Sequence, residues 1–136
     1  MRVYVAAPWS KKNEASAIAS TLEARGLMIT QRWWEHPETT DIRALRQQAS
    51  ADLRGVQDSD VFVYLGLGKS EGKATELGYA LAYGRPVVAY VPLAALDPHL
   101  NLFLYHTRVR TVSTLADLLF ELNILAKEFA YAETTI

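Results

Sequence analysis

The sequence predicts a single α/β domain built on a parallel sheet. Short apolar runs of strand character alternate along the chain with segments of helical period, a pattern typical of a sheet with helices on both faces. The chain has 136 residues, of which 50% are apolar or aromatic, so it can form one substantial core but not two. No repeat or linker divides it. We therefore expect one domain over residues 1–136, with about five parallel strands.

The first half of the chain is expected to form two strands and two helices. An apolar run predicts the first strand over Arg2–Ala6, and the helix that follows ends at Gly26, a residue type that favours helix termination. Leu27–Trp33 is expected to be the second strand. Asp41 can cap the second helix, because its carboxylate can accept from free backbone N–H groups. That helix is expected to turn an apolar stripe inward, consisting of Ile42, Leu45, Ala49, Leu53 and Val56.

The second half repeats this alternation. The segment SEGKATELGYALAYG reads as a loop that opens into a helix closed by Gly84. Residues 92–108 show no regular pattern. The remaining elements are expected to be strands over Val61–Leu65, Pro86–Val91 and Val109–Val112, with Pro86 at an edge position, and a final helix over Thr114–Phe129 whose apolar face is Leu115, Leu118, Leu119, Leu122 and Leu125.

Composition excludes several classes of function. Fourteen Lys and Arg residues against fifteen Asp and Glu give a net charge of −1, which provides no broad positive field for a nucleic acid. The absence of cysteine excludes thiol catalysis and disulfides, and three widely separated histidines do not predict a zinc site. No apolar stretch has the length of a membrane span or the pattern of a signal peptide. A cytoplasmic protein without membrane partners is expected.

Ligands of open parallel sheets bind beyond the carboxyl ends of the strands, where the strand order reverses. This rule places Ala7–Lys12 and Gly66–Glu76 at the expected site. Asp52 belongs to the helix before the third strand and lies at the edge of that helix's apolar stripe, so its carboxylate is expected to point toward the sheet. A capping or salt-bridging role at the helix flank would explain the same position.

Glu76 and Tyr4 are two further candidates. Glu76 lies in the first turns of a helix that follows a glycine-containing loop, where the helix dipole favours an anion. The dipole alone could account for a glutamate there. Together with Asp52, however, Glu76 would supply the pair of carboxylates that glycosidic cleavage requires. Tyr4, in the first strand, is either a core residue or a hydrogen-bond donor to the nucleophilic carboxylate.

The sequence resembles the nucleoside 2-deoxyribosyltransferases and the related 2′-deoxynucleoside 5′-monophosphate N-hydrolases. Three segments carry the resemblance in the same order: VYVAAPW, ADLRGVQDSDVFVYL and SEGKATELGYALAYGRPVV. Within them, Tyr4 matches the family's active-site tyrosine, Asp52 its catalytic acid and Glu76 its nucleophile. Asp60 matches the aspartate that opens the third strand. The spacing of Asp52, Asp60 and Glu76 is more specific than any single motif.

Two other matches bear on the substrate. Asn101, in HLNLF, matches an asparagine that in the transferases reaches into a neighbouring subunit's site, which Phe103 would line. Six residues before the nucleophile, where the transferases usually carry an aspartate that holds the sugar 5′-hydroxyl, this chain has Ser70, as the nucleotide hydrolases do. An aspartate would repel a phosphate, whereas a serine can donate to it. Asn101 favours the transferases instead, so nucleoside and nucleotide substrates both stay open.

The resemblance implies a flavodoxin-like (Rossmann-like) domain that works as a homodimer or larger assembly with shared active sites. It implies a retaining reaction in which Glu76 attacks C1′, Asp52 assists the departing base and Tyr4 orients Glu76. The deoxyribosyl group then passes to another nucleobase or to water, and we favour transfer slightly. The residues expected to bind substrate are Ala7, Trp9, Ser70, Gly72, Asn101 and Phe103.

No metal or organic cofactor is expected, because a carboxylate meets the positive charge that develops on the sugar. Three alternatives to a deoxyribosyltransferase remain at this point. The chain could hydrolyse 2′-deoxynucleoside 5′-monophosphates, it could be a nucleotide-binding module without turnover, or it could be a structural dimer whose acids only cap helices. Two inward-facing acids together with Tyr4 favour catalysis.

Overall fold

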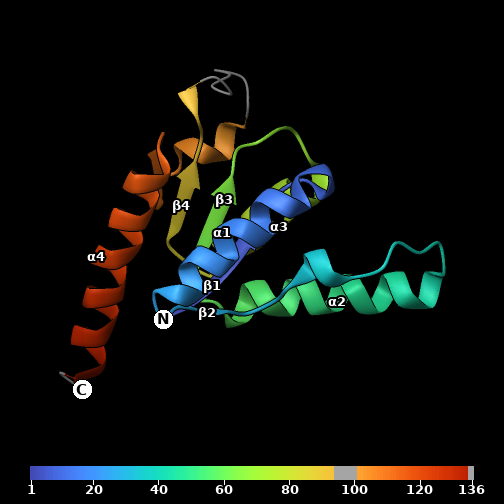
Figure 1. Ribbon diagram of the computed structural model, residues 1–136, viewed down its shortest axis with the longest axis horizontal. Coiled ribbons are helices and arrows are strands. Elements are labelled where there is room, and N and C mark those ends of the chain that lie inside the picture. The colour runs from blue at the N-terminus through green and yellow to red at the C-terminus, as the bar shows by residue number, and fades with distance from the viewer. Residues whose placement is uncertain (94–100, 135–136) are drawn as a thin grey trace.

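The computed structural model describes residues 1–93 and 101–134, and within these ranges a five-stranded parallel sheet forms the centre (Figure 1). The strand order is β2-β1-β3-β4-β5, the flavodoxin-like order. This confirms the predicted fold class. The strands are β1 (Arg2–Ala6), β2 (Met28–Ile29), β3 (Val61–Leu65), β4 (Val87–Tyr90) and β5 (Val109–Val112).

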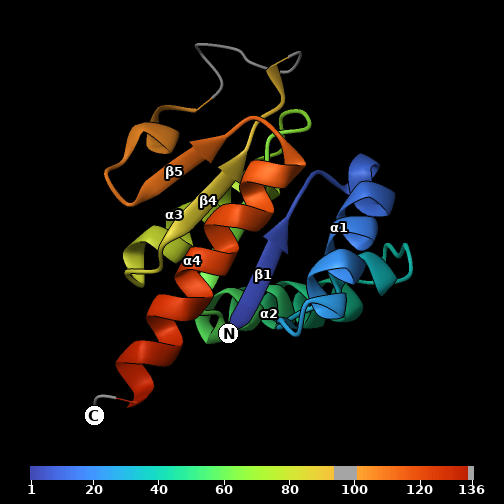
Figure 2. The same cartoon turned by 60° about the vertical axis from the view of Figure 1, so that its left-hand side comes forward.

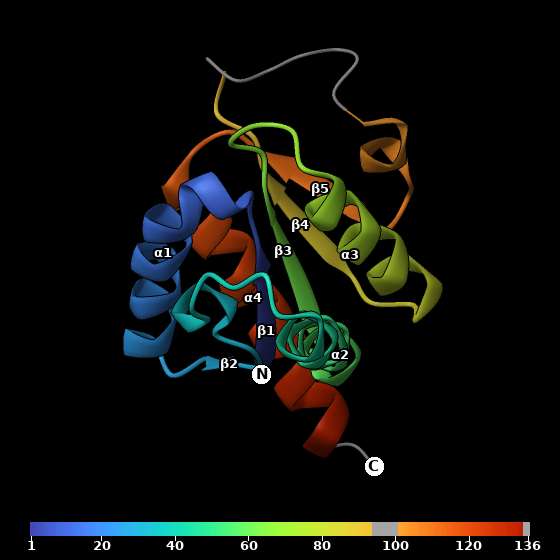
Figure 3. The ribbon, with the colours of Figure 1, turned by 90° about the vertical axis from the view of Figure 1, so that its right-hand side faces the viewer.

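The helices cover both faces of the sheet, with α1 and α4 on one face and α2 and α3 on the other (Figures 2 and 3). None of the helices in the described part of the chain has the length and apolarity needed to cross a membrane. The four α-helices described are α1 (Lys12–Ala24), α2 (Ile42–Asp58), α3 (Glu71–Ala82) and α4 (Leu115–Thr134), and short 3-10 turns are η1 (Trp9–Lys11), η2 (Trp33–Glu35) and η4 (Leu102–Tyr105).

The core lies around β1 and β3, which occupy the middle of the sheet. All five residues of β3 are buried, because helices cover the sheet on both sides and leave neither face to solvent. Leu22 of α1 and Leu122 of α4 are buried on one face, and Leu77 of α3 is buried on the other. Each such side chain contributes about 1.5–3 kcal/mol when fully buried.

The predicted second strand, Leu27–Trp33, is wrong in length, because β2 has only two residues. After Ile29, Thr30 donates its hydroxyl to the Gly55 carbonyl of α2 at 2.7 Å, which turns the chain toward that helix. The Trp33 indole then donates to the Val5 carbonyl at 2.7 Å. Side-chain hydrogen bonds therefore replace the strand pairing that the apolar run suggested.

The predicted inward stripe of α2 is also wrong in its first half. Ile42 and Leu45 are 63% and 45% exposed, and Ala49 is exposed as well, whereas Val56 is buried. The amino-terminal half of α2 projects beyond the sheet, so no strand lies beneath it (Figure 1). Helical period describes which side of the helix is apolar, but only the carboxyl-terminal half has a partner to cover that side.

Pro86 was expected at an edge position, yet it directly precedes β4, an interior strand between β3 and β5. It needs no amide hydrogen there because its carbonyl makes the contact, accepting from Phe62 N at 3.0 Å. The final helix runs to Thr134, beyond the predicted end at Phe129, and its Leu118 and Leu122 are buried as expected.

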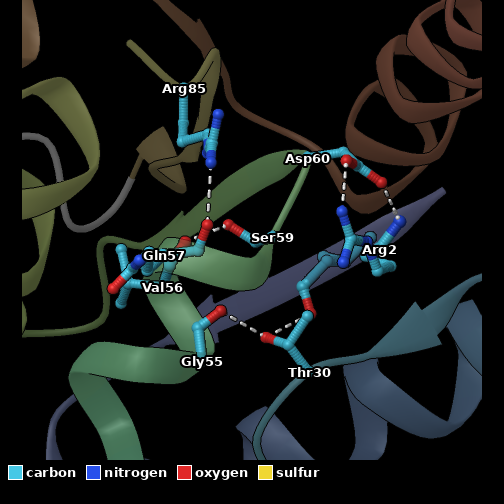
Figure 4. A network of polar contacts seen from close by, with 9 residues as sticks. Arg2, Thr30, Gly55, Val56, Gln57, Ser59, Asp60 and Arg85 are labelled. Atoms are coloured by element: carbon cyan, nitrogen blue, oxygen red, sulfur yellow. Dashed lines mark hydrogen bonds and ion pairs between the residues drawn. The ribbon is translucent and has the colours of Figure 1, made fainter. Parts of the chain in front are cut away.

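A network of polar contacts at the start of β3 connects this strand to β1 and connects the end of α2 to Arg85 (Figure 4). The Asp60 carboxylate accepts the backbone N–H of Arg2 at 2.7 Å and pairs with its guanidinium at 3.4 Å. Arg85 donates to the Gln57 carbonyl at 2.8 Å, at the end of α2. Asp60 therefore has a structural role, since it joins the beginnings of two adjacent strands.

The strand order reverses between β1 and β3. From β1 the chain passes through α1 to β2 on one side, and from β3 it passes through α3 to β4 on the other. A crevice is expected at the carboxyl ends of these two strands. The segments after β1 and β3 meet there, and they contain most of the residues predicted to form the site.

Candidate active site

Tyr4 and Glu76 form a direct hydrogen bond, in which the phenol donates to Glu76 Oε2. Tyr4 lies on β1 and is fully buried, with its ring stacked on Phe62 at 5.6 Å between centroids. Burial and the adjacent Glu76 charge raise the pKa of Tyr4 far above its ordinary value, so the hydroxyl keeps its proton. The carboxylate of Glu76 is thus held by a neutral donor fixed in the centre of the sheet.

The pKa of Glu76 is raised to about 7, chiefly because burial disfavours the charged form. The charge of Asp52 also raises this pKa, whereas the hydrogen bond from Tyr4 lowers it. Glu76 lies in the second turn of α3, which begins at Glu71, so it is outside the first turn where free N–H groups would stabilise an anion. Its surroundings, rather than the helix dipole, determine its ionisation.

Asp52 is part-buried on α2 and faces Glu76 and Tyr4 closely enough for its charge to raise the pKa values of both. Burial raises the pKa of Asp52 itself, while the hydrogen bond from Gln31 and the charge of His36 lower it. The Gln31 amide nitrogen lies 3.2 Å from Asp52 Oδ1 and 3.0 Å from His36 Nε2. Burial therefore raises the pKa of both acids, and Asp52 has in addition an amide donor and a histidine beside it.

Gln31 and His36 are neighbours of Asp52 that the sequence reasoning missed. Both follow β2, and the early end of that strand brings them to α2. A strand extending to Trp33 would have paired Gln31 with β1 instead. No sequence signal identifies them, because their role depends on where β2 stops.

Ser70 and Gly72 lie at the beginning of α3. Ser70 caps this helix, with its hydroxyl oxygen accepting from Lys73 N at 3.2 Å. A hydroxyl oxygen that accepts still has a hydrogen to donate, so capping is compatible with a contact to substrate. Gly72 is exposed in the first turn. Both residues therefore lie at the start of the helix that carries Glu76, as predicted.

Ala7 and Trp9 follow β1. Ala7 is buried, whereas Trp9 is 39% exposed, with the Lys12 ammonium 4.7 Å from its ring centroid. Trp9 borders an open hollow of about 780 Å³ whose other wall includes Gln48 of α2. Gln48 precedes Asp52 by one helical turn, but neither Asp52 nor Glu76 lines this hollow.

Asn101 and Phe103 lie farther along the chain, at η4. The Asn101 side chain accepts a hydrogen bond from Phe103 N at 2.9 Å. It also forms a hydrogen bond with the hydroxyl of Tyr64 on β3. Phe103 is 59% exposed. In the described part of the chain neither residue forms a hydrogen bond to Tyr4 or Glu76, and Asn101 instead joins η4 to the sheet.

Gly55 allows α2 to approach β1, and it lies one turn after Asp52. A Cβ added there would be 2.5 Å from Gln31 Cβ and 3.1 Å from Tyr4 Cδ2. We expect Gly55→Ala to lower the free energy of unfolding by about 1–3 kcal/mol, since overpacking forces neighbours to move. Gly78→Ala on α3 is the control, because nothing lies within 4 Å of its added Cβ. Urea denaturation of both variants measures the difference, and equal stabilities would contradict the close approach.

The fold and site together define a flavodoxin-like α/β domain in which two acids and a tyrosine lie together beside the central strands. The family model described as Nucleoside 2-deoxyribosyltransferase matches residues 3–107. This chain belongs to that family. No curated protein sequence matches it significantly.

Solved structures show the same fold at low sequence identity. A 2-deoxyribosyltransferase from Bacillus psychrosaccharolyticus is 17% identical with a TM-score of 0.69, over 87% of this chain and 90% of that one. The CMP N-glycosidase of Clostridium botulinum is 21% identical with a TM-score of 0.62, over 84% and 89%. A conserved protein from Enterococcus faecalis V583 is 21% identical with a TM-score of 0.66, over 90% and 97%.

Proposed function

We propose that this protein cleaves the N-glycosidic bond of a deoxynucleoside through a covalent glycosyl–Glu76 intermediate and passes the sugar to another nucleobase or to water. The observation that carries the proposal is the hydrogen bond from Tyr4 to Glu76 beside Asp52. A buried carboxylate held in one orientation is a suitable nucleophile, and a second acid with a raised pKa is a suitable proton donor. The family membership supports the same reaction class.

The proposed reaction has two steps. A Glu76 carboxylate oxygen forms a bond to C1′ while the bond from C1′ to the base nitrogen breaks, and Asp52 gives its proton to the departing base. In the second step an incoming base or water attacks C1′, its proton passes to Asp52, and the ester bond to Glu76 breaks. Both attacks invert C1′, so the overall configuration is retained. Tyr4 keeps its proton throughout and orients Glu76.

Chromatography of reaction mixtures tests this function. The protein is incubated with a panel of nucleosides and 5′-monophosphates, each with and without a second free base. A new nucleoside that forms only when the second base is present indicates transfer, and release of base without an acceptor indicates hydrolysis. No cleavage of any compound would refute the proposal and leave a nucleotide-binding module as the better interpretation.

A 5′-monophosphate is the second candidate substrate, favoured by Ser70 at the start of α3. The CMP N-glycosidase with the same fold acts on such a nucleotide, as its name states. The deoxyribosyltransferase with this fold favours the other candidate substrate, a nucleoside without a phosphate. The charge at position 70 can distinguish the two.

Ser70→Asp places a negative charge where the phosphate is expected. Two like charges about 4 Å apart repel by about 4 kcal/mol at an effective dielectric of 20, so kcat/KM for the monophosphate should fall at least about 100-fold. Ser70→Asn is the matched control, because Asn and Asp both cap helices and differ in charge. Cleavage of the nucleoside should be unchanged or improved in Ser70→Asp. Equal monophosphate activity in the two variants would exclude phosphate binding at Ser70.

We also propose that two copies assemble and share their sites. The exposed apolar side chains of η4 support this assembly: Leu102 is 77% exposed and Tyr105 is 72% exposed. A second copy that covered this turn would place its own Asn101 and Phe103 near the neighbour's crevice.

A further inference from the structure

Lys73 is a buried cation that the proposed reaction does not use. It lies on α3, one turn before Glu76, and is only 1% exposed. Its Nζ donates to the Leu65 carbonyl at 3.0 Å and to the Gly68 carbonyl at 2.6 Å, and it lies 4.2 Å from the centroid of the Tyr64 ring. These two carbonyls and the face of the ring together match the three N–H groups of an ammonium.

Burying this ammonium is costly, since an ion removed from water loses several kcal/mol of solvation. In residues 1–93 and 101–134 no carboxylate lies within ion-pairing distance of Nζ to offset that loss. Burial accordingly lowers the pKa of Lys73 to about 8. A methionine would fill a similar volume without this cost, so the contacts of the ammonium need an explanation beyond packing.

The two carbonyls bound by Lys73 belong to the loop between β3 and α3. Leu65 ends β3, and Gly68 lies in the middle of the loop with φ +129°, a conformation that favours glycine. The backbone N–H of Lys73 also donates to Ser70, the residue that ends this loop. One residue therefore fixes the beginning, the middle and the end of residues 65–70.

We infer that Lys73 is a positioning residue, which holds the loop of residues 66–70 so that Ser70 meets the 5′ end of the substrate while Glu76 meets C1′. The inference rests on the proposed function. Lys73 and Glu76 project from the same side of α3 onto Tyr64 and Tyr4. Lys73 anchors the loop to the helix that carries the nucleophile. It therefore sets the distance between Ser70, at the 5′ end of the sugar, and Glu76, at C1′.

The test uses Lys73→Met, which removes the donors and keeps most of the volume, and Lys127→Met as a control, because Lys127 is exposed on α4. Each variant is assayed with the best wild-type substrate and with the analogue that lacks the 5′ oxygen. We expect the ratio of the two kcat/KM values to fall at least tenfold in Lys73→Met and to stay unchanged in the control. Loss of equal size for both substrates would indicate a purely structural role and overturn the inference.

Two additions keep the test decisive. Lys73→Gln retains an amide donor and should recover part of the ratio if Lys73→Met folds poorly. Hydrogen exchange of residues 66–72, followed by mass spectrometry, should be faster in Lys73→Met than in the wild type and Lys127→Met. If the wild type cleaves no substrate, the proposed function fails. If hydrogen exchange of residues 66–72 is the same in Lys73→Met as in the wild type, Lys73 does not hold the loop and the inference fails separately.

Discussion

Glu76→Gln is expected to lower turnover at least about 10³-fold, the largest effect of any single substitution considered, because an amide is a poor nucleophile. The side chain keeps its shape, and its oxygen can still accept the hydrogen bond that Tyr4 donates. The loss would therefore come from chemistry and not from the fold. Activity is measured at saturating substrate, and circular dichroism checks that the variant is folded.

Glu128→Gln serves as the control, since this exposed glutamate lies on α4, on the opposite face of the sheet. The same change of Glu to Gln should leave its turnover close to that of the wild type. Mass spectrometry of acid-quenched wild type should find a deoxyribosyl group on the peptide that contains Glu76. More than about a tenth of wild-type turnover in Glu76→Gln would contradict a covalent intermediate at this position.

The second large effect concerns pH. The nucleophile must be ionised, and burial raises the pKa of Glu76 to about 7, so kcat/KM should fall as the pH drops through about 7. A glutamate with an ordinary pKa would stay ionised, and the enzyme active, down to below pH 5. The pH profile of kcat/KM for a neutral nucleoside measures this, because such a substrate has no phosphate to titrate in the same range.

Tyr4→Phe tests the cause of this profile. The hydrogen bond from Tyr4 lowers the pKa of Glu76, so its removal should raise that pKa. The fall of kcat/KM on the acid side of the profile, its acid limb, should then move to higher pH. Tyr83→Phe is the control, because Tyr83 is exposed at the end of α3, and it should leave the limb in place. A wild-type limb below pH 5, or one that Tyr4→Phe does not move, would mean that ionisation of Glu76 does not limit the reaction.

Part of the site follows directly from sequence pattern. The residue spacing and the family resemblance pointed to Tyr4, Asp52 and Glu76, and the structure brings these three side chains together. Their assigned roles stay predictions until the variants are measured. Ser70 was also expected near the start of the nucleophile's helix, where it forms the N-cap. Such residues are predictable because the carboxyl ends of adjacent parallel strands must meet at one edge of the sheet.

Sequence pattern was sufficient to predict the bounds of three of the five strands. The predicted strands Arg2–Ala6, Val61–Leu65 and Val109–Val112 coincide with the bounds of β1, β3 and β5. In β1 and β3 a continuous buried apolar stretch allows few other structures, whereas β5 has the sequence VRTV with Arg110 and Thr111 exposed.

Long-range contacts, in contrast, set where β2 stops, which half of α2 is covered, and in which direction the pKa values of the two acids shift. Gln31 reaches Asp52 because β2 ends early, and Lys73 is buried because the loop after β3 folds over it. These features depend on contacts between residues far apart in the sequence. Periodicity shows which side of an element is apolar, but a pKa or a close approach depends on what the rest of the chain brings to that side.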